Sequence, residues 1–188
     1  TRSLVESCDV YYYLMGDRAG IDRISEHAHK SGFGRLTGID LPYEKAGLVP
    51  SRAWKRDNFK QDPGWQKGET YNTSIGQGFN LVTPVQMAVY VSSLLNGGKL
   101  MKPLLVDTAE PEVTGLTPST EKERKFIAEA MRHTVYDQRG TARRILRTDA
   151  VMGGKTGTAQ VIRLGDVRVR AEEMLYEHRD HAWMVSWG

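Results

Sequence analysis

A lysine and two threonines alternate around a glycine at residues 155–158, within a segment typical of a β-strand. Successive side chains of a strand point to opposite faces, so Lys155 and Gly157 share one face, while Thr156 and Thr158 share the other. Because Gly157 has no side chain, a ligand or another backbone can approach it closely. An ammonium group, two hydroxyls and bare backbone are suited to an extended peptide that ends in a carboxylate. We therefore interpret residues 155–158 as a substrate-binding strand.

Two other interpretations fit this tetrapeptide when it is taken alone. Gly154-Lys155-Thr156 resembles the end of a phosphate-binding loop, but that motif requires a glycine where this chain has Asp149. It also requires a helix after the threonine, and no helical pattern follows here. The second alternative is an ordinary edge strand with an exposed lysine, which the four residues by themselves leave open.

Further motifs accompany K-T-G-T along the chain. They are S-C-D at 7–9, S-I-G-Q-G at 74–78, T-P-V-Q-M-A at 83–88, G-T-A at 140–142 and R-D-H-A-W at 179–183. In this order and over the whole chain, they resemble the C-terminal part of a class B penicillin-binding protein transpeptidase domain, most closely the elongation-specific penicillin-binding protein 2. The resemblance implies an α+β fold of the penicillin-binding protein and serine β-lactamase type, an antiparallel sheet with flanking helices.

The chemistry that this resemblance implies is acyl transfer through a serine ester. Ser7 would relay a proton, Lys155 would add positive charge beside it, and Asp9 stands where asparagine is commoner. An ionised carboxylate donates no hydrogen bond, so the contact of Asp9 must differ from that of the amide. Thr156, Gly157 and Thr158 would bind the substrate. Within this set, the Thr158 hydroxyl would bind the terminal carboxylate, and its N–H would be one of two donors to the oxyanion.

The nucleophilic serine of such an enzyme belongs to an S-x-x-K motif upstream of Ser7, and only six residues precede Ser7 here. The one S-x-x-K in the chain starts at Ser119, on the wrong side of Ser7 and before a run of charged residues. Thr120 and Glu123 have the spacing of a helix-capping box, so we interpret this site as a helix start. Residues 1–188 are therefore expected to be a partial transpeptidase domain. The nucleophile half, the last strand and the last helix would lie outside this chain, which alone would be inactive.

The resemblance also implies the biology of the parent protein. It would cross-link peptidoglycan stem peptides at the periplasmic face of the bacterial inner membrane, be acylated by β-lactams, and work with membrane proteins of the elongation complex. One alternative is a serine β-lactamase-like hydrolase, which would need a deacylating base. The other is a non-catalytic, penicillin-recognising sensor or interaction domain of the same fold.

Composition is that of a globular piece with one core: of 188 residues, 39% are hydrophobic and 26% are charged. The net charge of +3 is mild, and the basic stretch at 139–147 lacks the stacking aromatics of a nucleic-acid-binding face. The single cysteine, Cys8, excludes an internal disulfide and is expected to be small and buried. The five histidines have no zinc-like spacing, so neither a metal nor a cofactor is predicted.

Hydrophobic periodicity and the positions of glycine and proline predict the helices and strands that must position these residues. Helices are expected at 7–19, at 21–31, from a Thr83 cap with Pro84 to about residue 96, and at 122–136. Strands are expected at 151–162 and 181–187, on either side of a charged excursion. Residues 33–80 are punctuated by glycine and proline and are expected to be irregular, with Gly76-Gln77-Gly78 as a tight turn.

Overall fold

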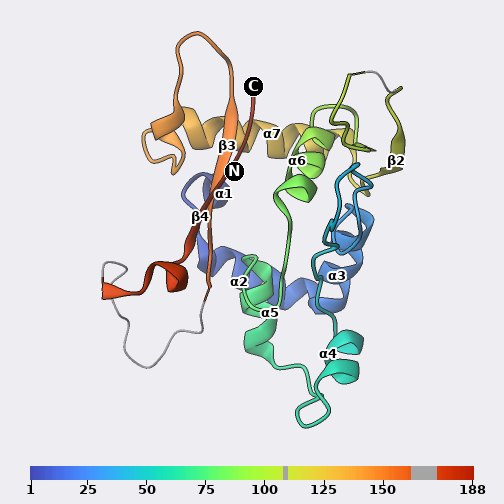
Figure 1. The fold of residues 1–188 in the computed structure, drawn as a ribbon. Helices are drawn as coiled ribbons and strands as arrows, with labels where there is room; N and C mark the ends of the chain where they lie inside the picture. The colour runs from blue at the N-terminus through green and yellow to red at the C-terminus, as the bar shows by residue number, and fades with distance from the viewer. Residues whose placement is uncertain (108–109, 162–172) are drawn as a thin grey trace.

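The computed structural model describes residues 1–107, 110–161 and 173–188 (Figure 1). Its α-helices are α1 Arg2–Val5, α2 Asp9–Ala19, α3 Ile21–Lys30, α4 Arg52–Asn58, α5 Lys67–Ser74, α6 Pro84–Ser93 and α7 Glu121–Tyr136. Its strands are β1 Lys99–Met101, β2 Val113–Leu116, β3 Gly153–Ala159 and β4 His181–Trp187, and two single 3-10 turns lie at η1 Arg143–Ile145 and η3 Tyr176–His178. The fold is α+β, with small antiparallel sheets among helices, as the sequence predicted.

The strand that carries K-T-G-T, β3, pairs antiparallel with β4. Lys155 lies opposite Val185, and Gly157 lies opposite Trp183. At the start of the ribbon the Trp187 indole lies against Gly153, where a Cβ atom would stand 2.5 Å from the ring. The ribbon packs against α7 and α6, as Figure 1 shows near the top of the molecule. The β1–β2 pair forms a separate two-stranded sheet.

Local capping sequences explain where the two helices beside the ribbon begin. Thr83 accepts a hydrogen bond from the Gln86 N–H at 3.2 Å, and the Gln86 carboxamide accepts one from the Thr83 N–H at 3.0 Å. Thr120 and Glu123 form the same reciprocal box at the start of α7. Such boxes satisfy N–H groups that a helix leaves unpaired at its start. Both helix starts confirm the prediction from sequence.

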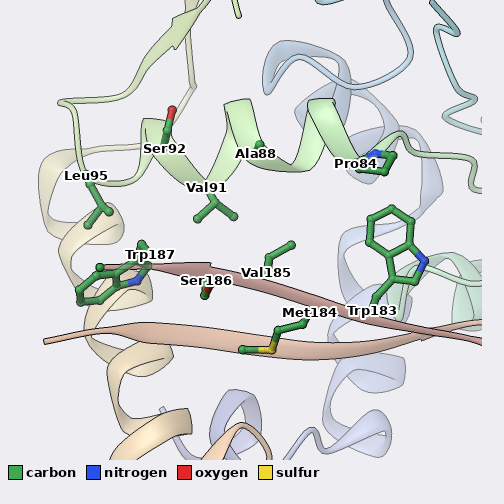
Figure 2. Close-up of a pocket in the computed structure, with 11 residues that line it drawn as sticks. Pro84, Ala88, Val91, Ser92, Leu95, Trp183, Met184, Val185, Ser186 and Trp187 are labelled. Atoms are coloured by element: carbon green, nitrogen blue, oxygen red, sulfur yellow. The ribbon is translucent and has the colours of Figure 1, made fainter. Parts of the chain in front are cut away.

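The core lies between α6, α7 and the inner face of the ribbon. Val91, Leu94 and Met131 form its buried centre, and Val185 and Trp187 of β4 pack against them. Figure 2 shows Val91 and Val185 pointing toward one another, whereas Met184 points to the opposite face of the ribbon. A trough of about 420 Å³ remains between α6 and β4. The alternation of β4 therefore divides its residues between a core face and an outer face, as a two-residue period requires.

The prediction that residues 33–80 are irregular is wrong for α4 and α5. Both are short and begin with polar caps: Ser51 accepts from the Trp54 N–H at 3.1 Å, and Gln66 and Glu69 form a capping box. The aromatic rings around them pack together with centroids 5.1 to 6.4 Å apart; they belong to Trp54, Phe59, Trp65 and Phe79. Helices of seven and eight residues are too short to show an apolar period clearly.

Four smaller points also differ from the predictions. The helix expected from Ser7 begins at Asp9, with Cys8 as its N-cap. Cys8 is exposed rather than buried. Strands β1 and β2, of three and four residues, were not predicted, because alternation cannot be seen over so few residues. Strand β3 is shorter than the predicted 151–162; residue 162 and most of the charged excursion lie outside the described residues.

Candidate active site

Ser7 occupies a corner between α1 and α2 and has a left-handed backbone. Its φ is +51°, one of two positive values among the described non-glycine residues. This conformation is unfavourable for a residue with a Cβ atom, and such residues concentrate at functional sites. The preceding turn is held by a segment distant in sequence, because the Thr141 N–H donates to the Val5 carbonyl at 3.2 Å. Ser7 is thus held in place rather than left in a free loop.

Lys155 of β3 reaches this corner, and its ammonium donates a hydrogen bond to the Ser7 hydroxyl. The same nitrogen donates to the Thr156 carbonyl at 2.8 Å. Burial lowers the pKa of Lys155, and the negative charge of Asp9 partly opposes that effect. Asp9 itself is exposed in the first turn of α2, where the helix dipole favours a carboxylate. A partly desolvated amine on a hydroxyl is an arrangement that can move a proton.

On the next residue of β3, the Thr156 hydroxyl donates to the Thr141 hydroxyl at 2.9 Å. Thr141 follows a tight approach of the chain to the end of α7: a Cβ atom on Gly140 would stand 2.1 Å from the Thr134 carbonyl. The Ala142 N–H donates to that carbonyl at 3.1 Å. From the sequence, Gly140-Thr141-Ala142 was only one of the spaced motifs. In the structure this motif supplies a side chain that orients Thr156.

Gln77 is a site residue that the sequence analysis treated only as part of a turn. Its side-chain nitrogen donates to the Thr158 carbonyl at 2.5 Å, and its side-chain oxygen accepts from the Gln160 N–H at 3.3 Å. The flanking residues Gly76 and Gly78 have φ of +81° and +74°, which confirms the tight turn. The sequence could have indicated a role for Gln77, since a tight turn does not require a long polar side chain between its two glycines.

A cavity of about 260 Å³ adjoins the K-T-G-T strand. All four residues 155–158 line it, together with Asn80 from the loop after α5 and Trp183 from β4. Gly157 and Thr158 are exposed, so both are accessible to a ligand. A Cβ atom on Gly157 would make only an ordinary 3.5 Å contact with Trp183. The cavity wall at Gly157 is therefore open to an approaching molecule rather than filled by this chain.

The structure brings Ser7, Asp9, Lys155, Thr156 and Gly157 to one region, and it keeps Ser119 away from them. Ser119 precedes the N-terminus of α7, and its hydroxyl lies 2.9 Å from that of Thr117. Thr141 follows the C-terminal end of the same helix, which has 16 residues and is therefore about 24 Å long. Ser119 thus lies at the opposite end of α7 from the corner that holds Ser7 and Lys155.

Two other kinds of feature are absent from the described residues. No three histidine, cysteine, aspartate or glutamate side chains within 1–107, 110–161 and 173–188 lie close enough together to hold a metal ion. In that same part of the chain, no helix combines the length and the apolar character that crossing a bilayer requires.

Comparisons with known proteins agree with this geometry. A family model described as the penicillin binding protein transpeptidase domain matches residues 1–188. The peptidoglycan D,D-transpeptidase MrdA of Escherichia coli is 35% identical over 199 residues, which cover 100% of this chain and 31% of that protein. MrdA of Acinetobacter baumannii is 34% identical, over 99% of this chain and 29% of the relative. The chain thus spans about a third of these relatives.

Solved structures give the same answer. Penicillin-binding protein 2 from Helicobacter pylori, in complex with MreC, is 33% identical with a TM-score of 0.82, over 98% of this chain and 32% of that one. Pseudomonas aeruginosa penicillin-binding protein 2, in complex with WCK 5153, is 33% identical with a TM-score of 0.79, over 98% of this chain and 40% of that one. The resemblance first drawn from spaced motifs is confirmed, and the chain belongs to the penicillin-binding protein transpeptidase domain family.

Proposed function

We propose that this chain is the Ser7, Asp9 and Lys155 half of a serine D,D-transpeptidase that cross-links peptidoglycan stem peptides. The observation that carries the proposal is the hydrogen bond from the Lys155 ammonium to the Ser7 hydroxyl, made across 148 residues beside an open cavity. Its nucleophile is a serine outside residues 1–188, in the part of the protein that the relatives have in addition.

The reaction divides into acylation and transfer. The nucleophilic serine gives its proton to the lysine of its own S-x-x-K motif, which also lies outside residues 1–188. Its oxygen attacks the carbonyl of the D-alanyl-D-alanine bond, and the terminal D-alanine leaves as the protonated amine. An acceptor amine of a second stem peptide then displaces the serine oxygen, so one amide bond is broken and one is formed. Ser7 passes a proton between the Lys155 amine and the leaving or attacking nitrogen, and burial of Lys155 makes its proton easier to give up. The Thr158 N–H stabilises the oxyanion, and its hydroxyl binds the terminal carboxylate.

The same site accounts for the partners and the location that we propose. β-Lactams resemble the D-alanyl-D-alanine end and would acylate the same serine. The parent protein would work at the periplasmic face of the inner membrane, held by an anchor outside this chain, with membrane proteins of the elongation complex. A solved relative in complex with MreC supports a partner of that kind.

The test is acylation of the full-length protein by benzylpenicillin, followed by intact mass. One persistent adduct is expected on the full-length protein and none on the 188-residue chain. Ser7→Ala and Lys155→Ala should each slow acylation by about 100-fold or more. Lys125→Ala is the matched control, since Lys125 forms an exposed ion pair on α7. An adduct that hydrolyses within seconds would indicate the β-lactamase-like hydrolase, and no adduct at all would indicate a non-catalytic sensor.

A further inference from the structure

The open edge of β3 is occupied at one end by a side chain from a distant turn. The Gln77 carboxamide spans from the Thr158 carbonyl, 81 residues away, to the Gln160 N–H, 83 residues away. One side-chain amide thereby donates to a backbone carbonyl and accepts from the backbone N–H two residues further along the chain. One residue of a neighbouring parallel strand would bond that same pair of groups, so the carboxamide replaces the N–H and C=O of one residue of an added strand.

The alternation of the antiparallel ladder decides which other groups share this edge. Thr158 directs its carbonyl away from β4, toward Gln77, so its N–H points to the same edge, and the backbone groups of Thr156 do so too. The Thr156 carbonyl accepts from the Lys155 ammonium at 2.8 Å. The N–H of Thr158 therefore lies between two carbonyls that are each held by a side chain of this protein, Lys155 on one side and Gln77 on the other.

Gln77 is itself held firmly enough to act in this way. Its N–H donates to the Asn72 carbonyl at 2.9 Å, and its own carbonyl accepts from the Asn80 side chain at 3.2 Å. Asn80 also donates to the Thr73 carbonyl at 3.1 Å. The turn is thus tied to the end of α5 on both sides of Gln77. Because the Gln77 backbone is fixed in this way, only its side-chain torsions have to be ordered when the carboxamide binds β3.

We propose that Gln77 is a positioning residue for acyl transfer. Its carboxamide clamps β3 through Thr158 and Gln160, so that the Thr158 N–H stays directed into the site. The inference rests on the proposed function and deepens it, because it assigns the alignment of an oxyanion donor to a residue that does not touch the reacting atoms. A carboxamide suits this task because it donates and accepts at once. A carboxylate could still accept from Gln160 but would repel the Thr158 carbonyl.

The test uses the full-length protein and four forms: wild type, Gln77→Met, Gln77→Glu and the control Gln61→Ala. Methionine keeps the length of the side chain and removes both hydrogen bonds, and Gln61 is an exposed glutamine in the loop before α5. Stopped-flow acylation with benzylpenicillin separates the dissociation constant of the initial complex from the acylation rate constant. The infrared band of the acyl-enzyme ester carbonyl reports the hydrogen bonds made to that oxygen.

Gln77→Met and Gln77→Glu should each lower the acylation rate constant by about ten-fold, less than the 100-fold or more that removal of an oxyanion donor causes. The dissociation constant should change by less than about two-fold, since binding and transition-state stabilisation are separate quantities. The ester carbonyl band should move to higher wavenumber, and Gln61→Ala should match the wild type.

Two results would overturn the inference while leaving the proposed function intact. One is an unchanged rate constant with an unchanged carbonyl band in both Gln77 variants, which would make the clamp irrelevant to the donor. The other is faster acylation in the variants, which would mean that the carboxamide competes with the substrate for the edge of β3. If the wild-type protein is not acylated at all, the proposed function fails instead. Thermal unfolding of each variant shows whether a lower rate comes from misfolding. In that case, the ester carbonyl band of the acylated fraction shows whether the oxyanion donor is still aligned.

Discussion

Ser7 offers a prediction that separates the strain of its backbone from the catalytic role of its hydroxyl. Its φ of +51° lies in the left-handed region, which costs a residue with a Cβ atom about 1–2 kcal/mol. Ser7→Gly and Ser7→Ala both remove the hydroxyl that accepts from Lys155. Only the glycine variant also removes the backbone strain. The difference between the two variants therefore isolates the strain from the lost hydrogen bond.

The expected size follows from two opposing effects. Relief of about 1–2 kcal/mol of strain is offset by the larger chain entropy that glycine loses on folding, about 0.5–1 kcal/mol. The net advantage of Ser7→Gly over Ser7→Ala is therefore about 0.7 kcal/mol. Such a difference raises the midpoint of thermal unfolding by about 2 °C for a domain of roughly 200 residues, and by about 1 °C for the larger domain of the full-length protein. Acylation by benzylpenicillin should fall by about 100-fold or more in both variants, because neither can relay a proton.

The assay pairs thermal unfolding of the full-length protein with acylation kinetics, and Tyr43 provides the control. Tyr43 has the second positive φ among the described non-glycine residues, +62°, and the residue is 90% exposed. Tyr43→Gly should raise the unfolding midpoint by a similar amount and leave acylation unchanged. If Ser7→Gly unfolds at or below the midpoint of Ser7→Ala, the left-handed backbone carries no strain and the reasoning is refuted.

Three further predictions concern β3, its lysine and a buried ion pair. Gly153→Ala should lower the unfolding midpoint by several degrees, because the new Cβ would stand 2.5 Å from the Trp187 ring. Gly157→Ala should unfold like the wild type, because its Cβ would make only a 3.5 Å contact, but it should be acylated more slowly. Asp9→Asn should lower the pKa of Lys155 further, which NMR of its ε-carbon would detect; an unchanged pKa would exclude Asp9 as the opposing charge. Since the folded pKa of Lys155 lies below its unfolded value of about 10.4, stability from this group should rise as pH passes from the folded pKa toward that value. Lys55→Met should clearly lower the unfolding midpoint, because the Lys55 side chain is 2% exposed and is ion-paired with Glu69 at 2.5 Å. Lys125→Met is the control: it breaks an exposed ion pair of equal length and should have little effect on the midpoint.

Lys55 also shows how a buried charge could not be foreseen. Hydrogen bonding to Glu69 raises the pKa of Lys55, so its contribution to stability is present below the unfolded value and is lost as pH rises through the folded one. A lysine in a glycine- and proline-rich stretch is normally exposed. Only the tertiary contacts that bring Glu69 of α5 and Asp62 to the Lys55 ammonium of α4 explain its burial, and neither helix was predicted.

The sequence alone determined the chemistry of the strand and the starts of the main helices. K-T-G-T specifies which groups lie on which face, because the pleat of a strand alternates side chains whatever surrounds it. The capping boxes at Thr83 and Thr120 also act within three residues, so their signals survive in isolation. Ordered motifs over the whole chain then identified the family, which the comparisons confirm.

Tertiary structure alone decided which of these groups meet. The contacts of Lys155 with Ser7, Gln77 with Thr158 and Thr141 with Thr156 join residues 148, 81 and 15 positions apart. No periodicity encodes such pairs, because they depend on how every intervening element packs. The left-handed Ser7 and the lowered pKa of Lys155 arise in the same way, from a corner and a degree of burial that exist only once α1, α2, α7 and β3 come together.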